Sequence, residues 1–434
     1  MDYEKLLSGY DYAEIRFEKV VGFSARISDG EAKQSAGTID GIGVRVLEKG
    51  SWGFASGDAR QDVEKLLESA QRLARLGRGK IALSIPKPVK RRIKDRFVFV
   101  DPVERLKALR EAAKDLDGKN IASRTISVSD SRSIIEFYNS EGADISQDTG
   151  YSYLSCSCVA REGANLQRGN ERSWSRRSFD KVDLGISAKA RGKAQRLLKA
   201  ASPPKGRFTV VLDPEMTGVF SHEAVGHACE ADAVVDKESI LAGKIGTRIG
   251  NELVTIYDDP TAEDFGRYAY DDEGVEARKT SLVEKGILKG YIDSMETAKE
   301  LGIRPNGHAR AESYSSIPIV RMSNTYFQKG GASLDDVFDV RKGVYLKGMR
   351  GGSVDIFAGG FMFKAEEAYM IKDGEKTELM HDVSISGNIL QTMKDVECVG
   401  KDWGGSPGMC GKGGQSVPVS DGGPHIRIRD VAIG

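Results

Sequence analysis

Apolar and polar residues alternate through the first fifty positions, which is the pattern of strands with one buried face. Two turn signals, SDGE (28–31) and EKGS (48–51), separate the strand-like runs. The period then lengthens to that of a helix over 61–76, QDVEKLLESAQRLARL, which Gly77 ends. These elements predict a first α+β unit over residues 1–80.

A second α+β unit is predicted over residues 81–200. Its first part is a basic linker that contains two prolines, after which Asp101 and Pro102 form the N-cap and first position of a helix. Alternating strands follow, with a turn at NSEG (139–142), so we expect an antiparallel meander with one face packed on that helix. A further helix is expected over 183–200.

The third unit is predicted over residues 207–434, after the linker ASPPKG (201–206). It begins with a buried strand, RFTVVL, and continues into a helix that Asp213 caps and Pro214 starts. Beyond that helix the pattern is one of short strands and glycine turns, all β in character. We therefore expect an α+β protein whose last unit is rich in strands.

Composition excludes several classes of protein. The 434 residues are 39% hydrophobic and 29% charged, and no apolar run approaches the roughly 18 residues of a membrane span. The N-terminus lacks the apolar core of a secretory signal, and an odd count of five cysteines does not indicate a disulfide framework, so we expect a cytoplasmic protein. With 64 basic and 64 acidic residues the net charge is zero, and the basic run at 87–96 is best explained as a solvated linker. We expect neither nucleic-acid nor membrane partners.

The stretch SHEAVGHACEAD (221–232) contains two of the five histidines, on the helix that follows the buried strand. In a regular α-helix His222 and His227 lie roughly 140° apart, too far to share one metal, and two unrelated histidines are one interpretation. A local π-bulge would bring them to within roughly 50° of each other. Gly226 permits this distortion because it has no side chain. Glu223 would then be placed to take a proton from a metal-bound water.

Two histidines do not complete a catalytic zinc site, which needs a third protein ligand and one open position. The residues themselves leave several candidates open: His308, His381, His425, Cys398, Cys410, Cys229 and Glu230. Cys410 is notable because it lies in GGSPGMCGKGGQS, where glycines allow the backbone to approach other structure closely. A buried, small hydrophobic residue is the other interpretation of that cysteine.

SHEAVGHACEAD resembles the His-Glu-x-x-x-His motif of the TldD/PmbA family of metallopeptidases, also known as modulators of DNA gyrase. Long segments resemble the family in the expected order, among them IGVRVLEKGSWGFASG, GGSVDIFAGGFMFKAEEAYMIKDGE and MCGKGGQSVPVSDGGPHIRI. The chain keeps His222, Glu223 and His227, so it resembles the catalytic TldD type, and the resemblance implies Cys410 as the third ligand of one zinc ion. It also implies an N-terminal antiparallel sheet with helices and a C-terminal barrel-like β domain that carries the metal-binding helix.

The resemblance implies a zinc-dependent peptidase that hydrolyses unfolded or extended peptides, with a zinc-bound water activated by Glu223. The chain is expected to form a homodimer or a heterodimer with a metal-free family paralogue. The residue that stabilises the oxyanion is not identifiable, but one distinctive segment offers four candidates that could equally be structural: His308, Tyr314, Arg321 and Asn324. The alternative function is a non-catalytic, metal-containing protein that regulates a toxin–antitoxin or topoisomerase partner.

Overall fold

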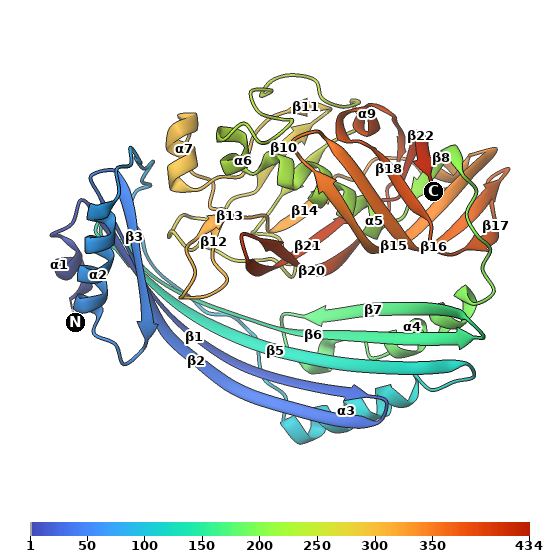
Figure 1. Ribbon diagram of the computed structural model, residues 1–434, viewed down its shortest axis with the longest axis horizontal. Helices are drawn as coiled ribbons and strands as arrows, with labels where there is room; N and C mark the ends of the chain where they lie inside the picture. The colour runs from blue at the N-terminus through green and yellow to red at the C-terminus, as the bar shows by residue number, and fades with distance from the viewer. Residues whose placement is uncertain (1) are drawn as a thin grey trace.

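The N-terminal half of the protein is built on one long, curved sheet (Figure 1). A computed structural model describes residues 2–434. The strand order is β3-β2-β1-β5-β6-β4, β7 pairs with β6, and every pairing is antiparallel except the one between β4 and β6. The strands are β1 (Tyr12–Ser28), β2 (Glu31–Glu48), β3 (Ser51–Asp58), β4 (Lys90–Ile93), β5 (Ile121–Asn139), β6 (Asp144–Glu162) and β7 (Asn165–Ser175). The strands of both predicted N-terminal units thus share this sheet.

Helices cover the face of this sheet that is turned away from the C-terminal half (Figure 1). Leu109 of α3 and Ala190 of α4 pack with Val128 and Leu154 of the sheet in one core, and Leu67 of α2 belongs to a second core beside it. The helices are α1 (Tyr3–Leu7), α2 (Val63–Leu76), α3 (Pro102–Lys114) and α4 (Ile186–Leu197). The helices leave the opposite face of the sheet free, and that face lines the space beneath the C-terminal half.

Five strands of the C-terminal half close into a barrel, in the order β15-β8-β22-β18-β16 with β16 returning to β15. They are β8 (Gly206–Leu212), β15 (Lys342–Asp355), β16 (Gly360–Lys372), β18 (Ser384–Asn388) and β22 (Ile426–Ile433), and the sheet also includes β17 (Glu375–Met380) and β19 (Val396–Val399). The α+β class, the antiparallel N-terminal sheet and the barrel-like C-terminal domain are confirmed.

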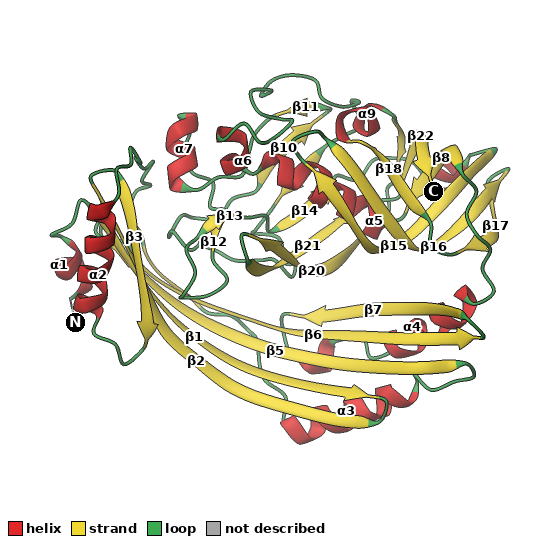
Figure 2. Ribbon diagram, in the orientation of Figure 1, coloured by secondary structure: helices red, strands yellow, loops and turns green. Residues whose placement is uncertain are grey.

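A second, six-stranded sheet packs beside the barrel, in the order β11-β10-β9-β14-β21-β20 (Figure 2). Its strands are β9 (Ile256–Asp258), β10 (Thr280–Glu284), β11 (Ile287–Leu288), β14 (Asn324–Phe327), β20 (Gly404–Lys412) and β21 (Gln415–Gly423). The short strands β12 (Ala309–Arg310) and β13 (Ile319–Val320) pair with each other. One large apolar core fills the space between the barrel and this sheet.

The expectation that everything after the helix of His222 and His227 is β in character was wrong. Short helices occur in this region: α6 (Ala231–Val235), α7 (Met295–Leu301), α8 (Leu334–Phe338) and α9 (Ile389–Lys394). Helices α7 and α8 each begin at a capping box, formed by Ser294 with Thr297 and by Ser333 with Asp336. Among the described residues, no helix has the length and apolar character needed to cross a membrane.

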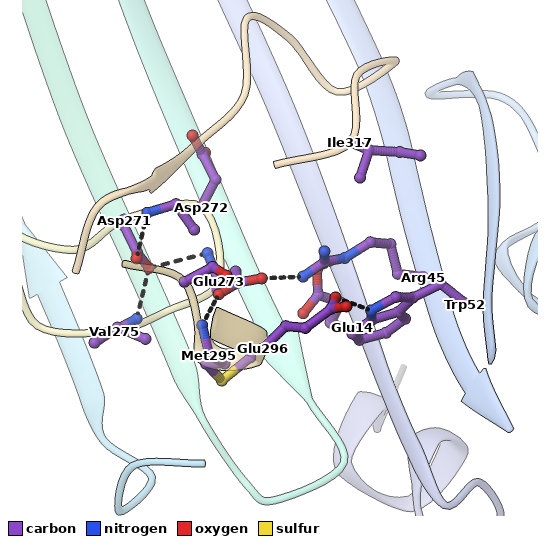
Figure 3. Close-up of polar contacts among 12 residues, drawn as sticks. Glu14, Arg45, Trp52, Asp271, Asp272, Glu273, Val275, Met295, Glu296 and Ile317 are labelled. Carbon is purple, nitrogen blue, oxygen red and sulfur yellow. Dashed lines mark hydrogen bonds and ion pairs between the residues drawn. The ribbon is translucent and has the colours of Figure 1, made fainter. Parts of the chain in front are cut away.

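A buried ion-pair cluster joins the N-terminal sheet to the C-terminal half (Figure 3). Arg45 on β2 donates to Glu14 on β1 (2.6 Å) and to Glu273 in the loop before β10 (2.9 Å). The three side chains are at most 5% exposed, and the Arg45 guanidinium also lies 4.3 Å from the centre of the Trp52 ring. Glu273 in turn accepts the backbone N–H of Met295, the first residue of α7. Because each buried charge has a partner, the cluster favours one fixed orientation of the two halves.

Candidate metal centre

The helix that follows β8 changes its winding between the two histidines. It begins as the α-helix α5 (Pro214–Val219), widens into a π-helical turn over Phe220–Gly226, and tightens into a 3₁₀ turn over His227–Cys229. The backbone N–H of His227 bonds to the carbonyl of His222, five residues earlier, as a π turn requires. The two imidazole rings therefore meet, with their centres 5.3 Å apart and their planes at 89°. The regular-helix alternative, with the rings pointing apart, is wrong.

Gly226 is needed here for space rather than for backbone freedom. Its backbone angles, φ −56° and ψ −58°, are accessible to any residue. A β-carbon at this position, however, would lie 2.0 Å from Sδ of Met322, which is fully buried. The π turn thus packs closely against the core at Gly226, and only glycine fits there without a shift of Met322.

Cys410 on β20 completes a cluster with the two histidines. Its sulfur lies 3.7 Å from Nε2 of His227, and one donor atom from each of His222, His227 and Cys410 lies within 4.8 Å of the others. Burial alone would raise the pKa of Cys410, but the hydrogen bonds and positive charge of the two imidazoles outweigh it and lower the pKa to about 5. The lowered pKa favours the thiolate, which is the state in which cysteine binds a metal.

The donor set fits a zinc ion. Two imidazoles and one thiolate are ligands that zinc favours, and a fourth position would remain for water or substrate. Nδ1 of His222 is buried and has no hydrogen-bond partner among the described residues. A buried polar atom without a partner is costly unless a ligand satisfies it, so this nitrogen is consistent with a site that a cation completes.

Glu223 lies at the open side of the cluster. Its carboxylate is 3.7 Å from Nε2 of His227. The Glu223 side chain is 36% exposed, whereas the His227 side chain is 15% exposed. His222 and Cys410 are almost fully buried. The cluster is therefore reached from solvent on the Glu223 side, where a carboxylate can exchange protons with a reacting molecule.

Other candidates for the third ligand lie elsewhere. Glu230 stands behind His227 and accepts from its Nδ1 at 3.0 Å. The remaining histidines bond to carboxylates of their own: His308 to Asp258, His381 to Asp382 and His425 to Asp402. Cys229 is buried in the apolar core, and Cys398 is half-buried on β19. Within residues 2–434, the side chains that come close enough together to hold one metal ion are thus His222, His227 and Cys410.

The four oxyanion candidates all have structural contacts. Arg321 donates to the carbonyls of Cys410 and Gln415, and so holds the β20–β21 hairpin that presents the sulfur. Asn324 bonds to Gly266, Asp259 and Ser420, and His308 lies between Asp258 and Asn306. The Tyr314 ring lies where a side chain on Gly41 of β2 would be. A role for any of them in binding an oxyanion stays a prediction that these contacts do not favour.

Sequence reasoning missed Lys412, which lies close to the cluster. Its ammonium contacts Glu230 at 3.2 Å and Asp232 at 2.6 Å. The two-residue spacing between Cys410 and Lys412 could have indicated this position. Both residues lie on β20, and residues two apart on a strand share a face.

Family models and relatives agree on what the chain resembles. The PmbA/TldA metallopeptidase C-terminal domain matches residues 205–434, domain 1 matches 13–75, and the central domain matches 99–198. A metalloprotease from Methanothermobacter thermautotrophicus is 43% identical, with 98% of this chain and 95% of that protein covered. A zinc metalloprotease TldD homolog from Saccharolobus solfataricus is 32% identical, with 98% and 97% covered.

Solved structures show the same fold. TldE from Thermococcus kodakarensis superposes with a TM-score of 0.82 at 25% identity, and 100% of this chain and 99% of that chain are covered. A putative modulator of a DNA gyrase from Thermotoga maritima has a TM-score of 0.81 at 21% identity, with 98% and 96% covered. Since the family models together span most of the chain and the relatives span nearly all of it, the chain belongs to the PmbA/TldD family of metallopeptidases.

Proposed function

We propose that this protein is a zinc-dependent peptidase in which His222, His227 and Cys410 hold one zinc ion and Glu223 is the general base. The observation that carries the proposal is the π turn, which brings two imidazoles five residues apart together beside the Cys410 thiol, with one half-buried carboxylate at the opening. A structural metal site would not need that free carboxylate. The names of the relatives support a metalloprotease, and the donor set favours zinc.

A zinc ion bound there would polarise the carbonyl of a scissile peptide and make a water molecule more acidic. Glu223 takes a proton from the attacking water, and it then returns that proton to the nitrogen of the leaving amine. His227 is held in one orientation by Glu230 on its far side, so its Nε2 stays directed at the cluster. The partial exposure of Glu223 lets it meet both the water and the leaving group without crossing the buried part of the site.

We propose unfolded or extended peptides as substrates. The face of the N-terminal sheet opposite its helices is hydroxyl-rich, and residues paired across β1, β5 and β6 place on it Ser24, Ser127, Ser129, Ser131, Ser133 and Ser155. A cavity of about 500 Å³ lies between this face and the C-terminal half, and Met409, the neighbour of Cys410, contributes to its wall. The serine hydroxyls on this face can hydrogen-bond to the backbone of an extended chain, and such bonds demand no particular side chain.

The assembly and compartment are also proposals. TldE, whose name marks a distinct member of the family, shares the fold over the full chain. This supports a dimer, with a second copy or with a metal-free paralogue. The five cysteines are all free thiols, which suits the reducing cytoplasm.

Glu223→Ala tests the catalytic role of the carboxylate. We expect the variant to keep one zinc per chain, measured by plasma emission spectrometry, and to lose hydrolysis of an unstructured peptide followed by mass spectrometry. Cys410→Ser, in contrast, should bind zinc more weakly, because a neutral hydroxyl replaces an anionic sulfur. A Glu223→Ala protein that cleaves at the wild-type rate would remove Glu223 as the base. A zinc-loaded wild type that cleaves no peptide would favour the regulatory alternative.

A further inference from the structure

A chain of charged contacts runs from the back of His227 to the strand that carries Cys410. Nδ1 of His227 faces Oε2 of Glu230 at 3.0 Å, and the same oxygen lies 3.2 Å from the ammonium of Lys412. Lys412 is on β20, two residues beyond Cys410. The Glu230 carboxylate therefore contacts both the candidate ligand His227 and the strand that carries the candidate ligand Cys410.

The surroundings of Lys412 fix its position. Its ammonium donates to both oxygens of Asp232, at 2.8 and 2.6 Å, and to the carbonyl of Val320 at 3.0 Å. With Glu230 as a fourth contact, its donors are fully used. Asp232 belongs to α6, which begins directly after Glu230, so Lys412 ties β20 to Glu230 and to the helix that follows it.

Glu230 depends on these partners. Its side chain is only 2% exposed, so an unpaired charge there would be strongly unfavourable. Its second oxygen, Oε1, has no hydrogen-bond partner among residues 2–434, which leaves His227 and Lys412 as the groups that compensate the charge. Loss of Lys412 should therefore disturb the contact between Glu230 and His227, and loss of His227 should disturb the contact between Glu230 and Lys412.

We propose that Glu230 and Lys412 act as a pair of positioning residues for the metal site. Glu230 accepts the Nδ1 proton of His227, which leaves Nε2 as the free nitrogen and fixes the plane of the ring. Lys412 holds Glu230 in place and fixes the distance between β20 and the histidine-bearing helix, and so the approach of the Cys410 sulfur. The inference rests on the proposed zinc site, and it adds residues that no ligand motif identifies.

Zinc affinity, measured by competition with a chromophoric chelator, tests the pair without reference to hydrolysis. Glu230→Gln keeps the shape of the side chain but removes its charge, and we expect a 10- to 100-fold weaker affinity, as is usual when the acceptor behind a ligand histidine is altered. Lys412→Met should weaken zinc binding in the same direction, and Lys412→Arg should restore part of the loss. Lys189→Met is the matched control, because it removes an exposed lysine–aspartate pair far from the site.

A cobalt titration separates positioning from a general loss of structure. The sulfur-to-cobalt charge-transfer band reports whether Cys410 still binds the metal. We expect Lys412→Met to weaken this band at equal cobalt occupancy, while the metal-free protein keeps a cooperative thermal transition. If Glu230→Gln does not fold, Lys412→Met and Lys412→Arg carry the test alone.

The effects of the two residues should also be coupled. Because they act through one contact, the double variant Glu230→Gln/Lys412→Met should lose less affinity than the product of the two single losses. Zinc affinities within twofold of the wild type for both single variants would overturn the proposal. A wild-type protein that binds no zinc would instead overturn the proposed function, so the two failures are distinguishable.

Discussion

Replacement of Gly226 by alanine is a sharp test of how the π turn is packed. A methyl group at this position would lie 2.0 Å from Sδ of Met322, 3.3 Å from its Cγ and 3.4 Å from its Cε. Met322 is fully buried in the main core, so its side chain cannot move out into solvent. Overpacking of this kind costs about 1–3 kcal/mol.

Calorimetry can measure this cost. For a chain of this length, with an unfolding entropy of about 2.1 cal/mol/K per residue, 1–3 kcal/mol lowers the melting temperature by roughly 1–3 °C. If the helix relieves the contact by losing its π turn, the two imidazoles separate and zinc affinity falls as well. We therefore expect Gly226→Ala to lower both the melting temperature and the zinc affinity.

A second substitution, at Met322, tests whether its contact with the new methyl group causes the destabilisation by Gly226→Ala. Met322→Ala alone should destabilise by about 2–5 kcal/mol because it leaves a cavity. The double variant should be more stable than the sum of the two single effects by roughly 1 kcal/mol or more, because the new methyl group occupies vacated space. Gly411→Ala on β20 is the matched control, since a β-carbon there meets nothing within 4 Å. The packing argument is refuted if Gly226→Ala melts like Gly411→Ala, or if the cycle is additive.

Three further predictions concern buried charges. Arg45→Met leaves Glu14 and Glu273 unpaired and should destabilise by about 3–5 kcal/mol, whereas Arg60→Met, which removes a guanidinium that is 90% exposed, should leave the melting temperature nearly unchanged. Burial raises the pKa of Asp293 to about 7, so the folded chain holds this proton more tightly than the unfolded chain and loses stability as pH rises from about 4 to 7. Asp293→Asn should therefore raise the melting temperature, relative to wild type, more at pH 8 than at pH 5; an equal effect at both would contradict the shift. Arg321→Met should weaken zinc binding roughly tenfold or more, because it removes the donor to two carbonyls of the β20–β21 hairpin. Wild-type zinc affinity in that variant would show that Arg321 does not support the site.

Local features of the fold were predictable from the sequence. Helix α2 ends at Leu76 before Gly77, and α3 begins at Pro102 after Asp101, as the capping residues predict. The turn after β1 has Asp29 and Gly30 at positive φ, as the hairpin signal requires. The π turn was an alternative that the histidine spacing offered, because two histidines five residues apart can share a site only if the helix widens, and the family resemblance then favoured it.

Long-range contacts were not predictable in the same way. Cys410 is 183 positions from His227 and Glu273 is 228 from Arg45, and such contacts leave no period in the sequence. Only the family resemblance pointed to Cys410. Helix α7 was missed although SMETAKELG carries a capping box and an ending glycine, because the surrounding glycine turns masked a helix of seven residues.

X-ray absorption at the zinc edge of the purified wild-type protein tests the central claim most directly. The account predicts one zinc per chain, bound by two imidazole nitrogens at about 2.0–2.1 Å and one sulfur at about 2.3 Å, with a lighter atom as the fourth neighbour. The sulfur contribution should vanish in Cys410→Ser. A zinc shell without sulfur in the wild-type protein, or one with more than one sulfur, would contradict the His222–His227–Cys410 site.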